Sequence, residues 1–214
     1  MKTKKARFES EQKNRILNAA VRVFGEKGYK GATIRNIGRA AKVNSALLYY
    51  YHENKHTLFT ESVRMILGEF LETLATRRRP FSNARERLTY LVDCVFDYYT
   101  EHPERMRLMA LALSSHSNLF AEALNAIVRE KVLVPLDVLR EGMDKGELRR
   151  MPPIHAWWSI IGMCLLNLLT RDLPVRVRTP EFHLPAFNAA ERKRHIVDLL
   201  MLGLANHPTK ERTS

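Results

Sequence analysis

Apolar residues recur at helical spacing along nearly the whole chain, and this periodicity constrains the fold more than any other feature. Ile16, Ala20 and Phe24 mark one apolar stripe in the first segment. Residues 88–99 carry apolar positions at i, i+3, i+4, i+7 and i+8, and residues 157–168 repeat that spacing. We find no alternation of apolar and polar residues that would favour a β-strand. The sequence therefore predicts an all-α protein.

The lengths of the predicted helices divide the chain into two parts. Up to residue 58 the helices are short and joined by turns, whereas the later helices are longer. We therefore expect an N-terminal three-helix domain over residues 1–58, in which residues 1–8 form a disordered basic tail. Residues 59–214 are expected to form a larger helical domain, in which the three prolines of residues 173–187 indicate a connecting loop.

Positive charge is concentrated in the first of these parts. Residues 1–58 hold 13 Lys and Arg against 4 Asp and Glu, a net charge of +9, while the rest of the chain contributes +3 of the total of +12. A localised excess of this kind indicates a surface that faces a polyanion, either nucleic acid or an anionic membrane surface.

Several other classes of protein are disfavoured. No apolar stretch reaches the ~18 residues that a membrane span needs, and charged residues interrupt the position of a signal-peptide core. Cys94 and Cys164 lie far apart, without a CxxC pair or clustered histidines, so neither a disulfide framework nor a metal site is expected. We find none of the common motifs of hydrolases, metalloproteases and nucleotide-binding enzymes. We expect a cytoplasmic protein that is not an enzyme and needs no cofactor.

Two short helices separated by a three-residue turn lie in the basic part of the chain. The first begins after Thr33, the turn covers residues 41–43, and the second covers about residues 44–51 with Leu48 placed to pack inward. A longer helix precedes them and gives them a surface to pack on. This arrangement predicts a helix-turn-helix, whose second helix enters the major groove of DNA.

The run over residues 24–59 carries a more specific pattern. It reads FGEKGYKGATIRNIGRAAKVNSALLYYYHENKHTLF, with aromatic, glycine and lysine residues at fixed spacing. In this pattern it closely resembles the TetR family of bacterial transcriptional regulators, and the downstream helices with His102-Pro103 are similar to that family's effector-binding domain. Lys42, Leu47 and His52 depart from the family's usual residues, which are Gly, Thr or Gly, and Phe.

The resemblance implies a set of DNA contacts. Thr33 corresponds to the residue that meets phosphate at a helix N-terminus, where the helix dipole favours an anion. Arg35 is expected to reach a guanine edge or a phosphate, and Leu47 to contact a thymine methyl group. Tyr50 is expected to pack in the core, and Lys42 is as consistent with solvated surface as with DNA contact. The expected contacts are Thr33, Arg35, Lys42, Asn44, Ser45, Ala46, Leu47, Tyr49, Tyr51 and Lys55.

A helix-turn-helix of this size reads only half of a near-palindromic site, so specific binding requires a dimer. The broad apolar faces of residues 155–170 and 189–205 are the expected dimer surface, and the resemblance implies that these two helices form a four-helix bundle with their counterparts. The alternative is that both helices belong to the core of a single chain. The expected interface residues are Trp158, Leu165, Leu169, Ile196, Leu199, Leu200 and Leu204.

Methionines and aromatic residues gather in the middle of the chain. Five of the eight methionines fall between residues 106 and 163, and such side chains suit the wall of an apolar ligand site. They are equally expected of a plain core. The expected pocket residues are Phe96, Tyr99, Met106, Met109, His116, Phe120, Trp157, Met163 and Asn167.

These features together predict a dimeric transcriptional regulator, in the form of a repressor that leaves a palindromic operator when a small, largely hydrophobic ligand binds. The expected partners are double-stranded DNA, a second copy of the chain and a small-molecule effector, and not a membrane. A ligand-independent architectural or adaptor DNA-binding protein of the same fold is the alternative.

Overall fold

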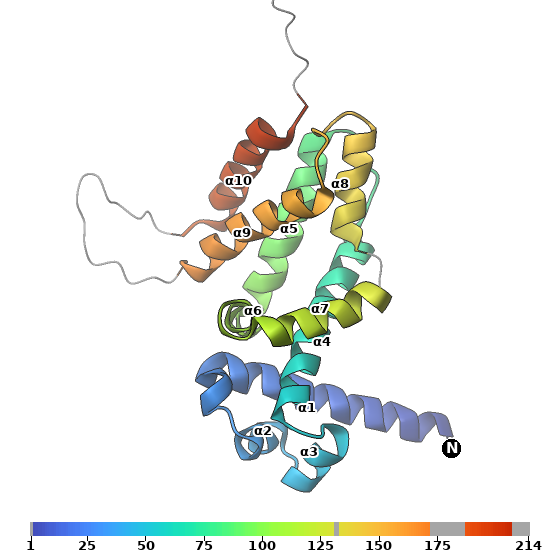
Figure 1. Cartoon of the computed structure of the whole chain (residues 1–214), viewed down its shortest axis with the longest axis vertical. Coiled ribbons are helices and arrows are strands. Elements are labelled where there is room, and N and C mark those ends of the chain that lie inside the picture. The colour runs from blue at the N-terminus through green and yellow to red at the C-terminus, as the bar shows by residue number, and fades with distance from the viewer. Residues whose placement is uncertain (1, 131–132, 172–186, 207–214) are drawn as a thin grey trace, which may run out of the picture. The chain divides into compact units, whose positions relative to one another are not determined.

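The computed structural model of the chain describes residues 2–130, 133–171 and 187–206, and helices make up its regular structure in these ranges. The helices drawn in Figure 1 are α1 (Lys2–Gly31), α2 (Ile34–Ala41), α3 (Ser45–Tyr51), α4 (Lys55–Arg77), α5 (Ala84–Glu101), α6 (Pro103–Ser115), α7 (Ser117–Glu130), α8 (Val134–Asp144), α9 (Pro153–Leu169) and α10 (Ala189–Leu204). The prediction of an all-α protein is confirmed. The loop expected over residues 173–187 lies, apart from Phe187, outside the described residues.

The chain divides into two compact units. Unit 1 comprises Met1–Glu72 and His102–Val132, and unit 2 comprises Thr73–Glu101 and Leu133–Ser214. Unit 1 therefore holds α1–α3, most of α4, and α6 and α7, while unit 2 holds the end of α4, α5 and α8–α10. Helix α4 runs without a break through residue 58, so the domain boundary expected there stays a prediction.

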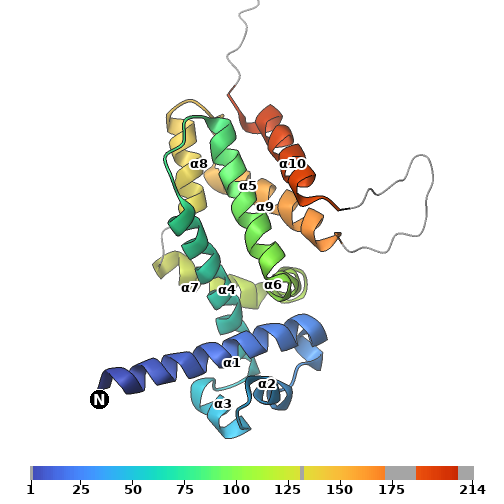
Figure 2. The same cartoon turned by 180° about the vertical axis from the view of Figure 1, so that it is seen from behind.

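Helix α1 supports two other helices of unit 1. Ile16, Ala20 and Phe24 are wholly buried, and α1 contacts both α2 and α6. At Gly28 the helix is interrupted by a φ of 67°, a left-handed conformation that glycine adopts without strain. The chain turns beyond this point into α2 and α3, which follow α1 in Figure 2.

The expectation of a disordered tail over residues 1–8 is wrong, because α1 begins at Lys2. No glycine or proline occurs before Gly25, and most residues of this stretch favour helix. Arg7 also pairs with Glu11 one turn later, with 2.9 Å between Nε and Oε1. Charge alone therefore does not prevent the segment from continuing the helix.

Helix α5 is the central helix of unit 2, where it contacts α8, α9 and α10. Leu88 and Leu91 on its inner face are wholly buried. On the side toward α10, the ammonium group of Lys193 lies 2.9 Å from carboxylate oxygens of both Asp93 and Asp97. An apolar core and a charged edge thus hold α10 against α5.

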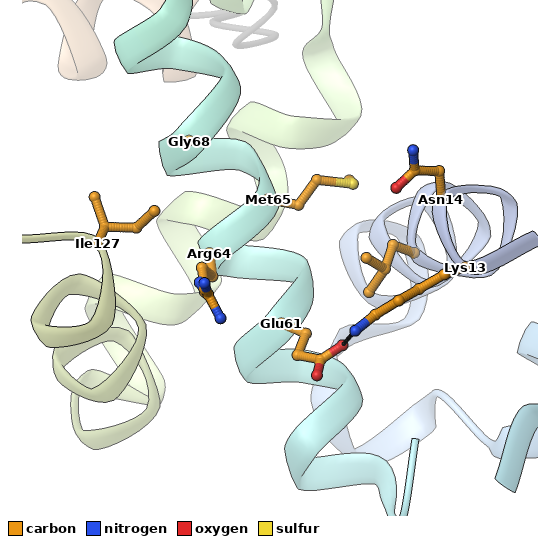
Figure 3. Close-up of a pocket in the computed structure, with 8 residues that line it drawn as sticks. Lys13, Asn14, Glu61, Arg64, Met65, Gly68 and Ile127 are labelled. Carbon is orange, nitrogen blue, oxygen red and sulfur yellow. Dashed lines mark ion pairs between the residues drawn. The ribbon is translucent and has the colours of Figure 1, made fainter. Parts of the chain in front are cut away.

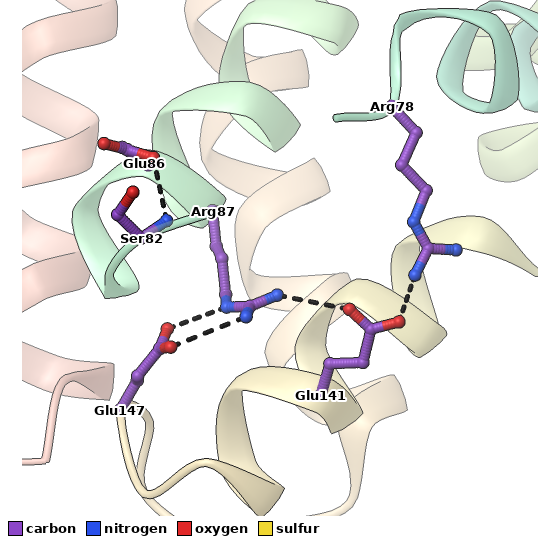
Figure 4. Close-up of polar contacts among 6 residues, drawn as sticks. All are labelled: Arg78, Ser82, Glu86, Arg87, Glu141 and Glu147. Carbon is purple, nitrogen blue, oxygen red and sulfur yellow. Dashed lines mark hydrogen bonds and ion pairs between the residues drawn. The ribbon is translucent and has the colours of Figure 1, made fainter. Parts of the chain in front are cut away.

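A buried arginine joins α5, α8 and the segment after α8. The side chain of Arg87 is 1% exposed, and its Nε donates to Glu147 Oε2 at 2.7 Å. Its Nη1 donates to Glu141 at 3.4 Å, and Glu141 also pairs with Arg78 (Figure 4). A Cβ at Gly142 would lie 3.0 Å from Arg87 Cδ and 2.9 Å from a Leu148 methyl carbon, so close packing requires glycine at this position.

Candidate nucleic-acid interface

Side-chain caps define the starts of the two short helices. Asn36 N–H donates to the Thr33 hydroxyl oxygen at 3.1 Å at the start of α2, and Leu47 N–H donates to the Asn44 amide oxygen at 2.8 Å at the start of α3. Helices of eight and seven residues are marginal by themselves, so caps worth about 1 kcal/mol each matter here. The predicted pair of short helices is confirmed.

The turn between α2 and α3 is held in one backbone conformation. Lys42 has a φ of 54°, a left-handed conformation that costs a side-chain-bearing residue roughly 1–2 kcal/mol. Val43 N–H donates to Gly38 O at 2.9 Å, and a Cβ on Gly38 would lie 3.0 Å from Val43 O. The left-handed backbone conformation explains why glycine is the usual residue at the position of Lys42 in the TetR-family pattern.

Helix α3 presents most of its surface to solvent. Leu48 is wholly buried, as predicted, while Ser45, Ala46 and Tyr49 are exposed. The expectation that Tyr50 packs in the core is wrong, because this side chain is 75% exposed. A helix of seven residues turns one narrow face inward, and Leu48 occupies that face. Four of the residues expected to contact DNA, Asn44, Ser45, Ala46 and Tyr49, are exposed at this helix, and Leu47 and Tyr51 are partly exposed.

Lys55 begins α4 directly after this motif. Its ammonium nitrogen lies 4.5 Å from the centre of the Tyr29 ring, a cation–π distance that orients the positive charge. Asn54 caps the same helix by accepting from Thr57 N–H at 2.9 Å. The positive end of the helix dipole and the lysine charge therefore coincide, which favours an anion such as phosphate. Thr33, Arg35 and Lys42 expose their side chains on the preceding segments of the same unit.

A buried histidine connects α3 to its supports. His52 is 1% exposed, and its Nδ1 lies 3.0 Å from Glu61 Oε2 of α4. The ammonium of Lys13 on α1 lies 3.1 Å from the same oxygen. The close contact with His52 lowers the pKa of Glu61 below its ordinary value; burial opposes this and Lys13 reinforces it. Sequence reasoning noted His52 as a departure from the TetR-family pattern but missed its contact with Glu61 and the pairing of Glu61 with Lys13.

A cleft of about 320 Å³ lies beside this triad. In Figure 3, α4 residues lie between residues from α1 on one side and Ile127 of α7 on the other, and a dashed line marks the ion pair of Lys13 with Glu61. None of the residues expected to line a ligand pocket belongs to it. Gly68, inside α4, was the sequence feature that could have indicated it. Glycine destabilises the interior of a helix, so a glycine at such a position often has a packing or functional reason. The lining residues are Lys13, Asn14, Leu17, Glu61, Arg64, Met65, Gly68 and Ile127.

The residues expected to line a pocket are distributed over both units. Met106, Met109, His116 and Phe120 belong to unit 1, and the other five belong to unit 2. The His116 ring lies 4.6 Å from that of Tyr29 and belongs to an aromatic cluster. The amide nitrogen of Asn167 donates to Met163 O of its own helix at 2.8 Å. The expected pocket stays a prediction; its remaining members are Phe96, Tyr99 and Trp157.

The helices expected to pair with a second copy expose apolar side chains in unit 2. Of the seven expected residues, three are exposed by 41% or more: Trp158, Leu169 and Leu199. Leu165 is partly exposed. Ile196, Leu200 and Leu204 are buried in the unit's own core, because α10 contacts both α5 and α9. Sequence reasoning missed the most exposed positions on this surface, which are Leu166 and Leu202 at 64% and 75%.

Among the described residues, no helix combines the length and the apolar character required to cross a bilayer. Of the two polyanions that the charge of residues 1–58 permitted, duplex DNA is the one that the helix-turn-helix fits. The exposed helix α3, the caps at Thr33 and Asn44, and the charge at Lys55 all lie in the basic segment.

Comparisons with known proteins give the same assignment. A family model described as bacterial regulatory proteins, tetR family, matches residues 16–61, and one described as tetracyclin repressor-like, C-terminal domain, matches residues 85–200. The HTH-type transcriptional repressor NicS of Pseudomonas putida is 33% identical over 172 residues, which cover 77% of this chain and 81% of that protein.

Two solved structures share the fold. FadR of Bacillus subtilis, crystallised with stearoyl-CoA, has a TM-score of 0.71 at 19% identity and covers 88% of this chain and 97% of that one. AibR, crystallised with isovaleryl coenzyme A and operator DNA, has a TM-score of 0.63 at 20% identity and covers 88% and 97%. The family models span more than half of the chain, which therefore belongs to the tetR family of bacterial DNA-binding transcriptional regulators.

Proposed function

We propose that the chain is a homodimeric repressor in the cytoplasm, which binds a near-palindromic operator and leaves it when a small, largely hydrophobic ligand binds. It acts by binding rather than by catalysis. The observation that carries the proposal is the exposed, capped helix α3 in the basic segment, with Leu48 as its only buried residue.

The contacts divide into two kinds. Thr33 and Lys55 lie at the N-terminal ends of α2 and α4, where phosphate is favoured, so they fix the position of the protein on the duplex. Ser45, Ala46 and Leu47, in the first turn of α3, face base edges, and Leu47 gives an apolar contact suited to a thymine methyl group. Arg35 is exposed on α2 and reads a base edge.

The surface of exposed apolar residues on α9 and α10 supports dimerisation. Contiguous exposed apolar side chains are unusual on a monomer and mark sites of association. Trp158, Leu166 and Leu169 contribute from α9, and Leu199 and Leu202 contribute from α10. A dimer places two copies of α3 on two half-sites, which a single motif does not read with sufficient specificity. Release by a ligand requires that the ligand bind the DNA-incompetent arrangement more tightly.

The test is selection of duplexes from a random pool by the purified protein, followed by fluorescence anisotropy over a range of salt concentrations. Arg35→Ala should lose discrimination at one base position. Lys55→Ala should weaken all duplexes alike and lower the slope of log affinity against log salt by about one. Arg107→Ala removes an exposed charge on α6 and is the control. Equal losses for Arg35→Ala and Lys55→Ala on every duplex contradict the assignment of Arg35.

A further inference from the structure

The cleft between α1, α4 and α7 combines features that recognise one class of ligand. Two cations, Lys13 and Arg64, line it together with a single carboxylate, that of Glu61. The lowered pKa of Glu61 keeps that carboxyl ionised at neutral pH, and the two cations still outnumber it in the lining. Leu17 and Ile127 are buried and present apolar atoms to the same cleft.

Its dimensions fit a small molecule. A volume of about 320 Å³ lies at the lower end of the range for ligand pockets, which is roughly 300–1,000 Å³. The flexible thioether of Met65 adapts to the shape of an apolar group. Gly68 lines the cleft without a side chain, in the middle of a 23-residue helix.

We propose that this cleft is the effector site of the protein, and that it takes a small monocarboxylate bearing an apolar group. The ligand's carboxylate pairs with Arg64 and Lys13, since guanidinium and ammonium groups form charge-assisted hydrogen bonds with it. The apolar group lies against Leu17, Met65 and Ile127. This inference rests on the proposed ligand-responsive function and assigns that function a site.

The position of the cleft explains how occupancy reaches the DNA-binding helices. Lys13 and Glu61 form an ion pair between α1 and α4 at 3.1 Å, and Glu61 in turn contacts the buried His52, which directly follows α3. A ligand carboxylate competes with Glu61 for Lys13 and so loosens the link between α1 and α4. Because α1 contacts α2 and α2 contacts α3, loss of this link shifts the equilibrium away from the DNA-competent arrangement.

The first experiment is calorimetric titration of the full-length protein, without DNA, with butanoate, octanoate and dodecanoate. 1-Octanol is the uncharged counterpart of octanoate. Inorganic phosphate tests whether the cleft binds any anion, without need of an apolar group. We expect at least one carboxylate to bind, 1-octanol to bind at least about tenfold more weakly, and phosphate not to compete. Failure of all three carboxylates to bind, equal binding of 1-octanol, or competition by phosphate overturns the proposal.

Variants locate the bound carboxylate. Arg64→Gln should weaken binding about tenfold or more, and Gly68→Leu should abolish it by filling the cleft. Arg107→Gln on α6 removes an exposed charge away from the lining and should leave binding unchanged. If circular dichroism shows that Gly68→Leu is unfolded, Lys13→Gln takes its place, with a loss similar to that of Arg64→Gln. Wild-type affinity in folded Arg64→Gln overturns the assignment to this cleft.

Fluorescence anisotropy with the selected duplex distinguishes failure of the effector-site proposal from failure of the proposed DNA-binding function. We expect saturating carboxylate to weaken duplex binding about tenfold in the wild type and much less in Arg64→Gln. If carboxylate releases the duplex equally from both proteins, the ligand response stands and the cleft is the wrong site. If carboxylate binds in the cleft without weakening the duplex complex, the cleft is not an effector site. A protein that binds no duplex contradicts the proposed function, while the calorimetry still tests the ligand site.

Discussion

Replacing Arg87 by alanine tests the energetic importance of the buried ion pair in unit 2. The substitution removes the hydrogen bonds with Glu147, and hydrogen bonds to charged groups contribute about 1.5–3 kcal/mol. It also removes a cation–π contact, since the guanidinium carbon lies 5.2 Å from the centre of the Phe81 ring, a contact worth about 0.5–1 kcal/mol. The pair with Glu141 adds little, because that carboxylate is 46% exposed.

We therefore expect Arg87→Ala to lower the free energy of unfolding by about 2–4 kcal/mol. The measurement is urea unfolding followed by far-ultraviolet circular dichroism at one fixed protomer concentration, because association shifts apparent stability. Arg85→Ala is the matched control, since Arg85 lies on the same helix and pairs with Asp198 at 2.7 Å. That pair is more than half exposed on both sides, so the control should lose less than about 1 kcal/mol.

A third variant separates charge from packing. Arg87→Met keeps an apolar stem of similar length beside Phe81 and Gly142 but removes the charge. Removing one partner of a buried ion pair leaves the other charge unpaired, and Glu147 is only 18% exposed, so methionine should restore packing but recover only a minor part of the stability that alanine loses. If Arg87→Ala unfolds at the same urea concentration as Arg85→Ala, burial of the pair does not stabilise unit 2 as argued.

Three further predictions follow from described contacts. Thr33→Ala should destabilise the protein by about 1 kcal/mol in urea unfolding, with Thr33→Ser retaining the cap and most of the stability. Burial raises the pKa of the Cys94 and Cys164 thiols to about 11 and about 12, so neither should react with a thiol reagent at neutral pH until urea unfolds the protein; rapid reaction of the folded protein contradicts this. Burial by itself raises the pKa of Asp97, but hydrogen bonds from Lys193 and Arg77 outweigh burial, so the net pKa lies below the ordinary 3.8. The ionised Asp97 carboxylate therefore stabilises the fold fully above about pH 3.8, and this stabilisation is lost as the pH falls below that value. Between neutral pH and lower pH, the urea midpoint of Asp97→Asn should therefore decline less steeply below about pH 3.8 than the midpoint of the wild type.

The helices were predictable from the sequence because their apolar periodicity and caps are local. The bounds of α2 and α3 follow from Thr33, from Asn44 and from the turn at Lys42, all within a few residues of the helices they limit. Exposure was less predictable, since it depends on which neighbours exist. Tyr50 belongs to a run of three tyrosines that looks apolar, but only one face of so short a helix has a partner.

The candidate ligand site could not be predicted for a similar reason. Its residues come from three helices, and lining residues on different helices lie 44 or more positions apart in the chain, so only packing brings Lys13, Arg64 and Ile127 to one cleft. The dimer surface could be predicted only in part. The apolar character of α10 indicated burial, but the sequence did not show that Ile196 and Leu200 face the unit's own core while Leu202 faces solvent.

The exposed leucines of α9 and α10 have a consequence for gene dosage. If the operator-binding species forms through these side chains, its concentration at low expression rises with the square of the number of chains per cell. Doubling synthesis then raises the binding species up to fourfold, and dilution by cell growth lowers it equally steeply. A leucine such as Leu202, which lies on α10 outside the helix-turn-helix, would set the threshold of expression at which the operator is occupied.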